Sequence, residues 1–259
     1  MEKKQSKKTI STQGYIIISP DKKFLFLLTF IKKNTQSKLI FIFSTSEEVE
    51  FYKTLLIQYH IDSLSISQSQ TEIINKENYK KFTQSKKGIL LSTNLIKLKF
   101  NIPLINWIIF FDTPKDINEY NEMISINSKD DFSKTKSLLL LFPSEEDFIK
   151  NNKSINKFNY SAGNIDKDQK KVEKIVNTKV HYLYSISIDA YRAFLFDYVT
   201  RSDKVLFDLD KVDVRDLCKS FGIEHPPFVN FNKVLGVDTS IKDKKSKKKI
   251  KKRKNENDE

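Results

Sequence analysis

Paired carboxylates, three histidines and one cysteine are the residues of this 259-residue sequence whose types could carry out chemistry. Glu47-Glu48 and Glu145-Glu146 place two carboxylates together, as acid–base catalysis requires. Both pairs follow a serine at a predicted helix start, where acidic side chains interact favourably with the helix dipole, so a structural role is favoured. His60, His181 and His225 are far apart, which argues against a metal site or a histidine-based triad.

Two further kinds of site are not indicated by the sequence. Cys218 is the single cysteine, which excludes an internal disulfide and indicates a reducing compartment. Its helical context predicts a core position rather than a nucleophile. No GxxxxGK[ST] phosphate loop occurs, and with five glycines in the chain no loop of that kind can be assembled. These residues alone therefore predict no independent enzyme.

The positive charge is concentrated at the ends of the chain. The formal net charge is +13, and ten of the thirteen residues from 242 to 254 are Lys or Arg. Such tails bind polyanions or act as nuclear addresses, and a solvated tail without function is the alternative. We expect RNA as the polyanion, because no lipid-anchor signal accompanies the charge. Since no signal peptide and no apolar run of the ~20 residues of a membrane span occur, we expect a soluble intracellular protein with no membrane partner.

One stretch, residues 88–129, is expected to position any site. Apolar runs at its start and around Trp107 predict two strands that are buried on both faces, as in a parallel sheet. Asp116 can cap a helix that continues to the end of the stretch. Ligands of open α/β sheets bind at loops beyond the strand ends. We therefore expect a site at residues 93–101 and beside residues 123–129.

Strand and helix patterns alternate over the first 155 residues. This alternation predicts an α/β fold with an open parallel sheet of about six strands and helices on both faces. Helical spacing follows, and Gly222 is suited to end the last helix. The expected parts are a basic tail at 1–12, the sheet domain at 13–155, a linker at 156–166, a small helical C-terminal extension at 167–232, and a disordered Lys-rich tail at 233–259.

Several stretches resemble one protein family. They are QGYIIISPDKKFLFLLTFIKKN from residue 13, KLIFIFSTS from 38, GILLSTN from 88, NIPLINWIIFFDTPKDINEY from 101 and DVRDLCKSFGIEHPPFVN from 213. On these residues the chain resembles the C-terminal half of DEAD-box ATP-dependent RNA helicases, in the nucleolar subfamily that acts in ribosomal RNA maturation. The resemblance implies a RecA-like domain, pre-rRNA and pre-ribosomal proteins as partners, and a location in the nucleus and nucleolus.

Motif V of that family is partly retained. Thr93 is kept, whereas the family's arginine, glycine and aspartate fall on Leu98, Lys99 and Asn101. The resemblance implies that Thr93 and Thr45, which belongs to motif IV, donate hydrogen bonds to RNA phosphates. The alternative is that both threonines merely end strands. Further RNA contacts, which would weaken steeply with salt, are expected from the tail residues Lys247, Lys248, Lys249, Lys251, Lys252 and Arg253.

Motif VI has lost the residues that serve ATP hydrolysis. Met123 and Ile126 stand where the family has two arginines that reach the γ-phosphate. An arginine finger is worth roughly 10³ to 10⁵ in rate, or about 4 to 7 kcal/mol of barrier, and apolar side chains cannot replace it. The P-loop and the Asp-Glu-Ala-Asp motif of the first RecA-like domain are also missing. We therefore expect no catalytic residue and no cofactor, with ATP relevant only beside a separate first domain.

Three functions remain open. We prefer a catalytically degenerate helicase half that binds RNA in ribosome biogenesis. A split helicase would work with a separately encoded N-terminal RecA-like domain and use Lys97, Lys99 or Lys129 in place of arginine. A protein-docking module would not bind RNA. An ATPase assay with an added N-terminal domain separates the first two, and RNA binding without residues 242–259 separates the third.

Overall fold

The structure is a computed structural model that describes residues 8–9, 12–126, 135–152, 154–160, 166–178 and 181–229. Residues 1–226 form one compact unit and residues 227–259 a second. The predicted RNA contacts of the tail, Lys247 to Arg253, lie outside the described residues. Residues 127–129 of the predicted helix lie outside them as well.

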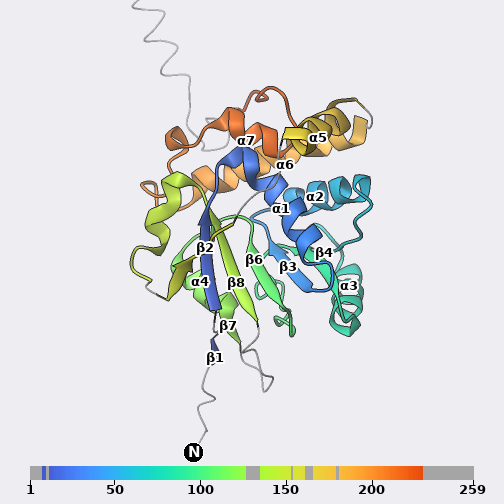
Figure 1. Cartoon of the computed structure of the whole chain (residues 1–259), viewed down its shortest axis with the longest axis vertical. Helices are drawn as coiled ribbons and strands as arrows, with labels where there is room; N and C mark the ends of the chain where they lie inside the picture. The colour runs from blue at the N-terminus through green and yellow to red at the C-terminus, as the bar shows by residue number, and fades with distance from the viewer. Residues whose placement is uncertain are drawn as a thin grey trace, which may run out of the picture. The chain divides into compact units, whose positions relative to one another are not determined.

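Seven parallel strands form the central sheet (Figure 1). Across the sheet they are β4 (Leu64–Ile66), β5 (Gly88–Ser92), β3 (Lys38–Ile42), β6 (Trp107–Phe110), β8 (Lys136–Leu141), β2 (Thr12–Ile17) and β9 (Ile155–Lys157). This arrangement confirms the predicted α/β fold with an open parallel sheet, although one strand more than the expected number is present. The additional strand, β9, pairs with β2, with Gln13 opposite Ile155, so the sheet extends into the segment expected as a linker.

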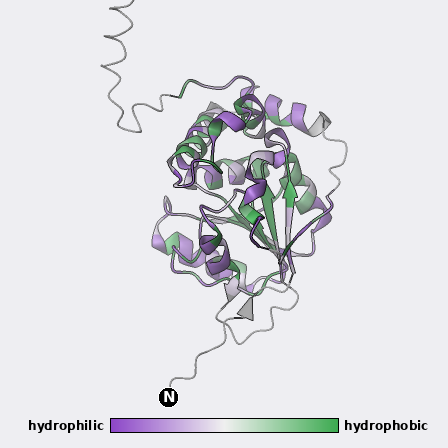
Figure 2. Cartoon of the chain, turned by 90° about the vertical axis from the view of Figure 1, so that its left-hand side faces the viewer, coloured by the Kyte–Doolittle hydropathy of each residue, from purple (hydrophilic) through white to green (hydrophobic). Residues whose placement is uncertain are grey.

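Helices cover both faces of the sheet, and β3 shows how its residues divide between them. All five residues of β3 are buried. Phe41 points toward α1 (Lys23–Lys33), where its ring lies 6.3 Å from that of Phe30, and α2 (Ser46–Gln58) covers the same face. Ile40 belongs to the core cluster on the other face, with Phe82 of α3 (Glu72–Gln84) and Tyr120 of α4 (Ile117–Ile124). Figure 2 shows the resulting hydrophobic strands between helices with polar outer faces.

The helix after β6 is shorter than the sequence predicts. Asp116 caps it as expected, because its Oδ1 accepts a hydrogen bond from the Glu119 N–H (2.8 Å). The helix ends at Ile124, and the next two residues form β7 (Ser125–Ile126), which pairs antiparallel with β1 (Lys8–Thr9). The prediction of a helix across β7 is therefore wrong. A similar difference follows β8, where the expected acidic helix is the 3₁₀ helix η2 (Pro143–Ile149).

The C-terminal extension packs against the α1 and α2 side of the sheet domain (Figure 1). It consists of α5 (Asp166–Thr178), α6 (His181–Thr200), the 3₁₀ helix η3 (Leu209–Lys211) and α7 (Val214–Ser220). α6 lies along α2, and α7 lies against the 3₁₀ helix η1 (Pro20–Lys22). The Tyr52 hydroxyl of α2 donates a hydrogen bond to Ser220 O (3.3 Å), and its ring lies 5.8 Å from that of Phe221. The extension therefore shares an aromatic core with the sheet domain.

Gly222 ends the last helix, as the sequence predicts. Its φ of +68° is a left-handed conformation that favours glycine. Its N–H donates to Lys219 O (3.0 Å), and the Ile223 N–H donates to Cys218 O (3.0 Å), which satisfies carbonyls at the helix end. A Cβ at this position would lie 2.5 Å from Val176 Cγ2 of α5. Glycine therefore permits both the turn and the close approach of α5. Cys218 is buried, as predicted, and burial raises the pKa of its thiol to about 11.

Candidate functional site

A cavity of about 540 Å³ opens at the carboxyl ends of β3, β5 and β6. The residues after these strands supply Ser44 and Thr45, Thr93 and Asn94, and Asp112 to Pro114. Because parallel strands end at one edge, these three loops meet there, which is the usual ligand position in open α/β sheets. Further lining residues include Gln68 and Ser69, which follow β4, and the side chains used below, which are Lys97, Lys115, Glu119, Met123, Asp197 and Arg201.

Thr45, the first threonine expected to contact RNA, caps α2. Its Oγ1 accepts a hydrogen bond from the Glu48 N–H (3.3 Å). Glu48 Oε2 in turn accepts hydrogen bonds from the Thr45 N–H (3.2 Å) and from Thr45 Oγ1 (3.0 Å). This capping box satisfies backbone donors at the helix start. A phosphate that binds the Thr45 hydroxyl would therefore compete with Glu48 for its proton.

Thr93, the second expected contact, lies at the end of β5 on the wall of the same cavity. Its backbone N–H donates to Ile66 O (3.3 Å). Its Oγ1 is shielded from water and has no hydrogen-bond partner among the described residues. Buried hydroxyls in folded proteins are nearly always hydrogen-bonded, so an unpaired one calls for an explanation. The hydroxyl therefore lacks a partner, and because water does not reach its oxygen, a ligand oxygen could bind it only after a local shift of the Thr93 side chain or its loop.

The loop after Thr93 keeps a tight turn although its residues depart from the motif V pattern. Asn94 Oδ1 accepts hydrogen bonds from the N–H groups of Ile96 (3.0 Å) and Lys97 (3.1 Å). Lys99 has a φ of +63°, in the left-handed region that disfavours residues with a Cβ. It stands where the family pattern has glycine. Lys99 therefore adopts a conformation that glycine would adopt without strain.

Glu119 of α4 joins this loop to the loop after β6. Its Oε1 accepts hydrogen bonds from Asn94 Nδ2 (3.0 Å) and Lys97 Nζ (2.5 Å), and its Oε2 accepts one from the Lys115 N–H (2.8 Å). Burial opposes ionisation of this carboxyl, but these hydrogen bonds outweigh burial and hold its pKa below the usual range. Lys97, one candidate substitute for a motif VI arginine, is thus held in an ion pair.

Met123 occupies the cavity wall at a position where the family has arginine. It is 1% exposed and belongs to the core cluster beneath the sheet. Ile126, at the second arginine position, lies in β7. Neither residue type carries a charge or a hydrogen-bond donor on its side chain. The chain therefore presents no arginine at either position that would reach a γ-phosphate.

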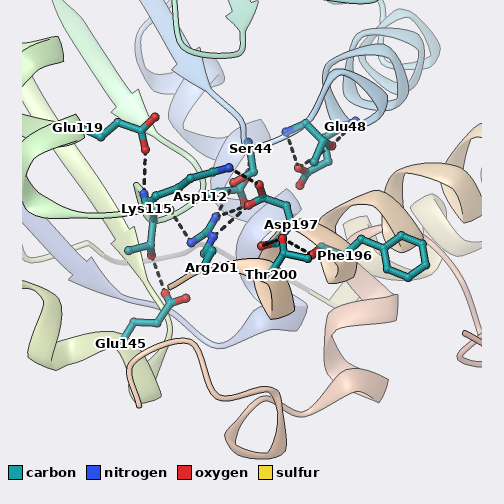
Figure 3. A network of polar contacts seen from close by, with 12 residues as sticks. Ser44, Glu48, Asp112, Lys115, Glu119, Glu145, Phe196, Asp197, Thr200 and Arg201 are labelled. Carbon is teal, nitrogen blue, oxygen red and sulfur yellow. Dashed lines mark hydrogen bonds and ion pairs between the residues drawn. The ribbon is translucent and has the colours of Figure 1, made fainter. Parts of the chain in front are cut away.

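A buried ion pair joins Lys23 to Asp112, a residue of the cavity lining that Figure 3 labels. Lys23 Nζ contacts Asp112 Oδ1, and the two side chains are only 4% and 2% exposed. Asp112 Oδ2 accepts a hydrogen bond from the Ser44 N–H (2.9 Å), and Lys23 Nζ lies 4.5 Å from the centre of the Phe111 ring. A buried charge requires such partners, since removal of one would leave the other unpaired. The pair joins α1 to the loops after β3 and β6.

One carboxylate of each sequence pair is buried beside this ion pair. Glu48 is fully buried and Glu145 is 2% exposed. Burial and the charge of Asp112 raise the pKa of Glu48 well above its ordinary value, against the effect of Lys23. Burial also raises the pKa of Glu145, although its Oε2 accepts a hydrogen bond from Thr113 Oγ1 (2.6 Å). Both side chains bond to loop residues, which agrees with a structural role.

The residues that the structure describes contain neither a metal-binding cluster nor a membrane-spanning helix. No three His, Cys, Asp or Glu side chains in that part of the chain are grouped so that they could hold a metal ion. None of its helices is long and apolar enough to cross a membrane. The cavity at the strand ends is therefore the site on which the functional argument rests.

Comparison with known proteins identifies the family. The helicase conserved C-terminal domain matches residues 22–125. The ATP-dependent RNA helicase has1 of Schizosaccharomyces pombe is 34% identical over 222 residues, which cover 84% of this chain and 38% of that protein. The chain corresponds to the C-terminal half of a DEAD-box RNA helicase. The ATP-dependent RNA helicase HAS1 of Saccharomyces cerevisiae is 31% identical over 222 residues, which cover 84% of this DEAD-box half and 44% of that protein.

A solved structure supports the same assignment of the fold. Mss116p DEAD-box helicase domain 2 bound to an RNA duplex aligns with 88% of this DEAD-box half, at a TM-score of 0.67 and 16% sequence identity, and 94% of that chain is covered. The fold is therefore that of domain 2 of a DEAD-box helicase. This DEAD-box half spans less than half of the length of the two curated relatives above, 38% and 44%.

The structure brings together some of the expected site residues and adds others. Thr45 and Thr93 line one cavity, and the described residues Asn94, Lys97 and Met123 of the two expected regions line it as well. Sequence reasoning missed Lys23, which lies within an apolar helix without any distinguishing signal. It also missed Arg201 of the extension, whose partners lie far away in sequence. Asp112 could have been found, because it directly follows a buried strand and precedes a proline.

Proposed function

We propose that this DEAD-box half binds the phosphate backbone of RNA at the strand-end cavity and takes part in ribosome biogenesis without hydrolysing ATP by itself. The observation that carries the proposal is the pair of threonines, Thr45 and Thr93, that line one cavity of about 540 Å³ at the carboxyl ends of β3 and β5. Hydroxyl contacts to phosphate position a nucleic acid without reading its sequence. Binding of this kind should therefore tolerate different RNA sequences.

The absence of arginine at the motif VI positions supports the catalytic part of the proposal. Met123 is packed into the core, so no small rotation of its neighbours would place a cation there. Lys97 Nζ lies 2.5 Å from Glu119 Oε1, and Lys97 does not stand at either motif VI arginine position. Transition-state charge on a transferring phosphoryl group therefore lacks the stabilisation that an arginine finger provides. The split helicase remains the alternative, with Lys99 or Lys129 as the other candidate cations.

The kinship with HAS1-type helicases supports the cellular part of the proposal. We infer pre-rRNA as the RNA, pre-ribosomal proteins as further partners, and the nucleolus as the location. The basic tail, with Lys247 to Arg253, would add contacts that fall steeply with rising salt. Binding through the cavity and binding through the tail can therefore be distinguished by their salt dependence.

Substitution of Thr93 tests the proposal. Fluorescence anisotropy of a labelled single-stranded RNA would measure the affinity of the full chain at several salt concentrations, including values that suppress contacts from the tail. Thr93→Val keeps the shape of the side chain and removes the unpaired hydroxyl. Because a hydrogen bond to a charged group contributes about 1.5 kcal/mol, the affinity should fall about tenfold.

Thr35→Val is the matched control for this experiment. Thr35 is exposed and precedes β3, so it lies near the amino ends of the strands, whereas the cavity lies at their carboxyl ends. The same change at this position should leave the affinity for RNA unaltered. Equal affinities for both variants and the unchanged chain would contradict the proposed site. No measurable binding by the unchanged chain would contradict RNA binding altogether and would favour a protein-docking module.

A further inference from the structure

Arg201 directly follows the last residue of α6. Its buried guanidinium lies where the C-terminal extension meets the cavity (Figure 3). Its side chain is 1% exposed. Nε and Nη2 lie 2.9 Å and 2.8 Å from Asp197 Oδ2, one helical turn earlier. Nη1 donates to Thr113 O (2.8 Å), and Nη2 donates to Ser44 Oγ (2.7 Å). One side chain of the extension thus contacts the loops after both β3 and β6.

The contacts of Arg201 fix its plane as well as its position. The guanidinium carbon lies 4.4 Å from the centre of the Phe207 ring and 5.6 Å from that of Tyr198. Asp197 also holds Lys115, whose Nζ lies 3.1 Å from Asp197 Oδ1. A planar guanidinium beside two rings, with donors directed at two loops, has little freedom of rotation. Through Ser44 and Thr113, the extension therefore holds the loop after β3 and the loop after β6 at a fixed separation.

Stability alone is a poor explanation for this arrangement. A buried ion pair contributes little net stability, because desolvation of both charges offsets their attraction. What the fork geometry of arginine does provide is several directional hydrogen bonds at once, which a lysine cannot reproduce. The residue directly after Ser44 is Thr45, one of the two hydroxyls proposed to contact RNA. A shift of the Ser44 loop would move that hydroxyl relative to Thr93 across the cavity.

We infer that Arg201 is a positioning residue for RNA binding: it sets the separation of the strand-end loops from the side of the C-terminal extension and need not touch the RNA itself. The inference rests on the proposed function, since it presupposes that RNA binds in the cavity. It assigns to the extension a direct part in the geometry of the site. Loss of the hydrogen bonds from Arg201 to Ser44 and Thr113 should weaken RNA binding even when the positive charge is kept.

Arg201→Lys in the full chain tests this inference. The charge is retained, but the simultaneous bonds to Ser44 and Thr113 are lost, so the affinity for single-stranded RNA should fall about tenfold, as for the loss of one hydrogen bond to a charged group. The slope of log affinity against log salt should not change, because no phosphate contact is lost. Arg192→Lys is the matched control, since Arg192 is exposed on the same helix. It should bind RNA as the unchanged chain does.

A double-mutant cycle with Ser44→Ala distinguishes positioning from a general loss of stability. If Arg201 acts through the Ser44 loop, the two changes should be strongly non-additive in RNA affinity, whereas Arg201→Lys and Thr93→Val should be closer to additive. Additive effects of Arg201→Lys and Ser44→Ala, or an unchanged affinity for Arg201→Lys, would overturn the inference. Should Arg201→Lys fail to fold, Ser44→Ala alone must weaken binding at an unchanged salt slope, and unchanged binding would overturn the inference.

The outcomes for the proposed function and for this inference are separable. Failure of the unchanged chain to bind RNA would remove the proposed function. Binding by the unchanged chain that is lowered by Thr93→Val but not by Arg201→Lys would retain the proposed function and remove the role of Arg201.

Discussion

Two exposed lysines line the cavity, and each is paired with a carboxylate. Lys97 Nζ lies 2.5 Å from Glu119 Oε1, and Lys115 Nζ lies 3.1 Å from Asp197 Oδ1. Ion pairs of this exposure are worth about 0 to 1 kcal/mol, so a phosphate could displace the carboxylates at small cost. The carboxylates nevertheless compete with RNA for the same cations. At the scale of single residues, affinity for RNA is thus limited by negative charge inside the site.

Glu119→Gln should therefore strengthen RNA binding. The substitution releases Lys97 from its ion pair and keeps an oxygen that can accept the Lys115 N–H. We expect an affinity about threefold higher, and a slope of log affinity against log salt steeper by up to about 0.7, the value for one additional contact to single-stranded RNA. Anisotropy titrations at several salt concentrations measure both quantities. Glu122→Gln, an exposed neighbour on the same helix, should behave as the unchanged chain, and equal effects of the two substitutions would contradict the expectation.

Among the elements, α7 and the turn that follows it depend most clearly on one residue. Gly222→Ala must place a Cβ 2.5 Å from Val176 Cγ2 and 3.0 Å from Val172 Cγ1, at a φ of +68°. The left-handed conformation costs roughly 1 to 2 kcal/mol for a residue with a Cβ, and displacement of α5 adds to that cost. We expect the free energy of unfolding to fall by about 2 to 4 kcal/mol.

Urea denaturation followed by circular dichroism measures that change, and Gly14→Ala is its control. A Cβ at Gly14 would meet its nearest neighbour, Phe158 Cβ, at 3.4 Å, which is close to an ordinary contact. The control should lose no more than about 1 kcal/mol. A loss at Gly222 as small as that at Gly14 would show that the end of α7 can rearrange freely.

The elements that the sequence predicts correctly are those whose signal is local. The apolar runs of β3 and β6 and the cap of α4 at Asp116 can each be recognised from a few adjacent residues. The early end of α4 cannot, because Ser125 leaves the helix to pair with Thr9 near the start of the chain. The contacts of Lys23 and Arg201 are hidden for the same reason, since their partners are remote in sequence. Thr45 and Thr93 were recognised through the family resemblance and not from their spacing.

At the scale of the whole molecule, the extension and the sheet domain form one compact unit over residues 1–226. α6 lies along α2, and its end contributes Asp197 and Arg201 to the cavity lining. From the sequence, the extension is predicted to be a separate helical part that follows a linker at residues 156–166. In the structure the extension and the sheet domain share one core, because Tyr52 of the sheet domain packs against Phe221 of the extension. Any function of the cavity therefore depends on both parts of the unit.

ATP hydrolysis is the activity that the whole molecule should lack. When the full chain is mixed with the N-terminal RecA-like domain of a DEAD-box helicase, ATP and RNA, release of inorganic phosphate should not exceed that of the N-terminal domain alone. The physical reason is that Met123, which is buried, and Ile126 stand at the positions of the missing arginines, so charge on the transferring phosphoryl group lacks the stabilisation that an arginine finger provides. A DEAD-box C-terminal domain that carries both motif VI arginines serves as the positive control. RNA-stimulated phosphate release by this chain, abolished by Lys97→Ala, Lys99→Ala or Lys129→Ala, would instead establish a split helicase in which lysine has taken the part of arginine.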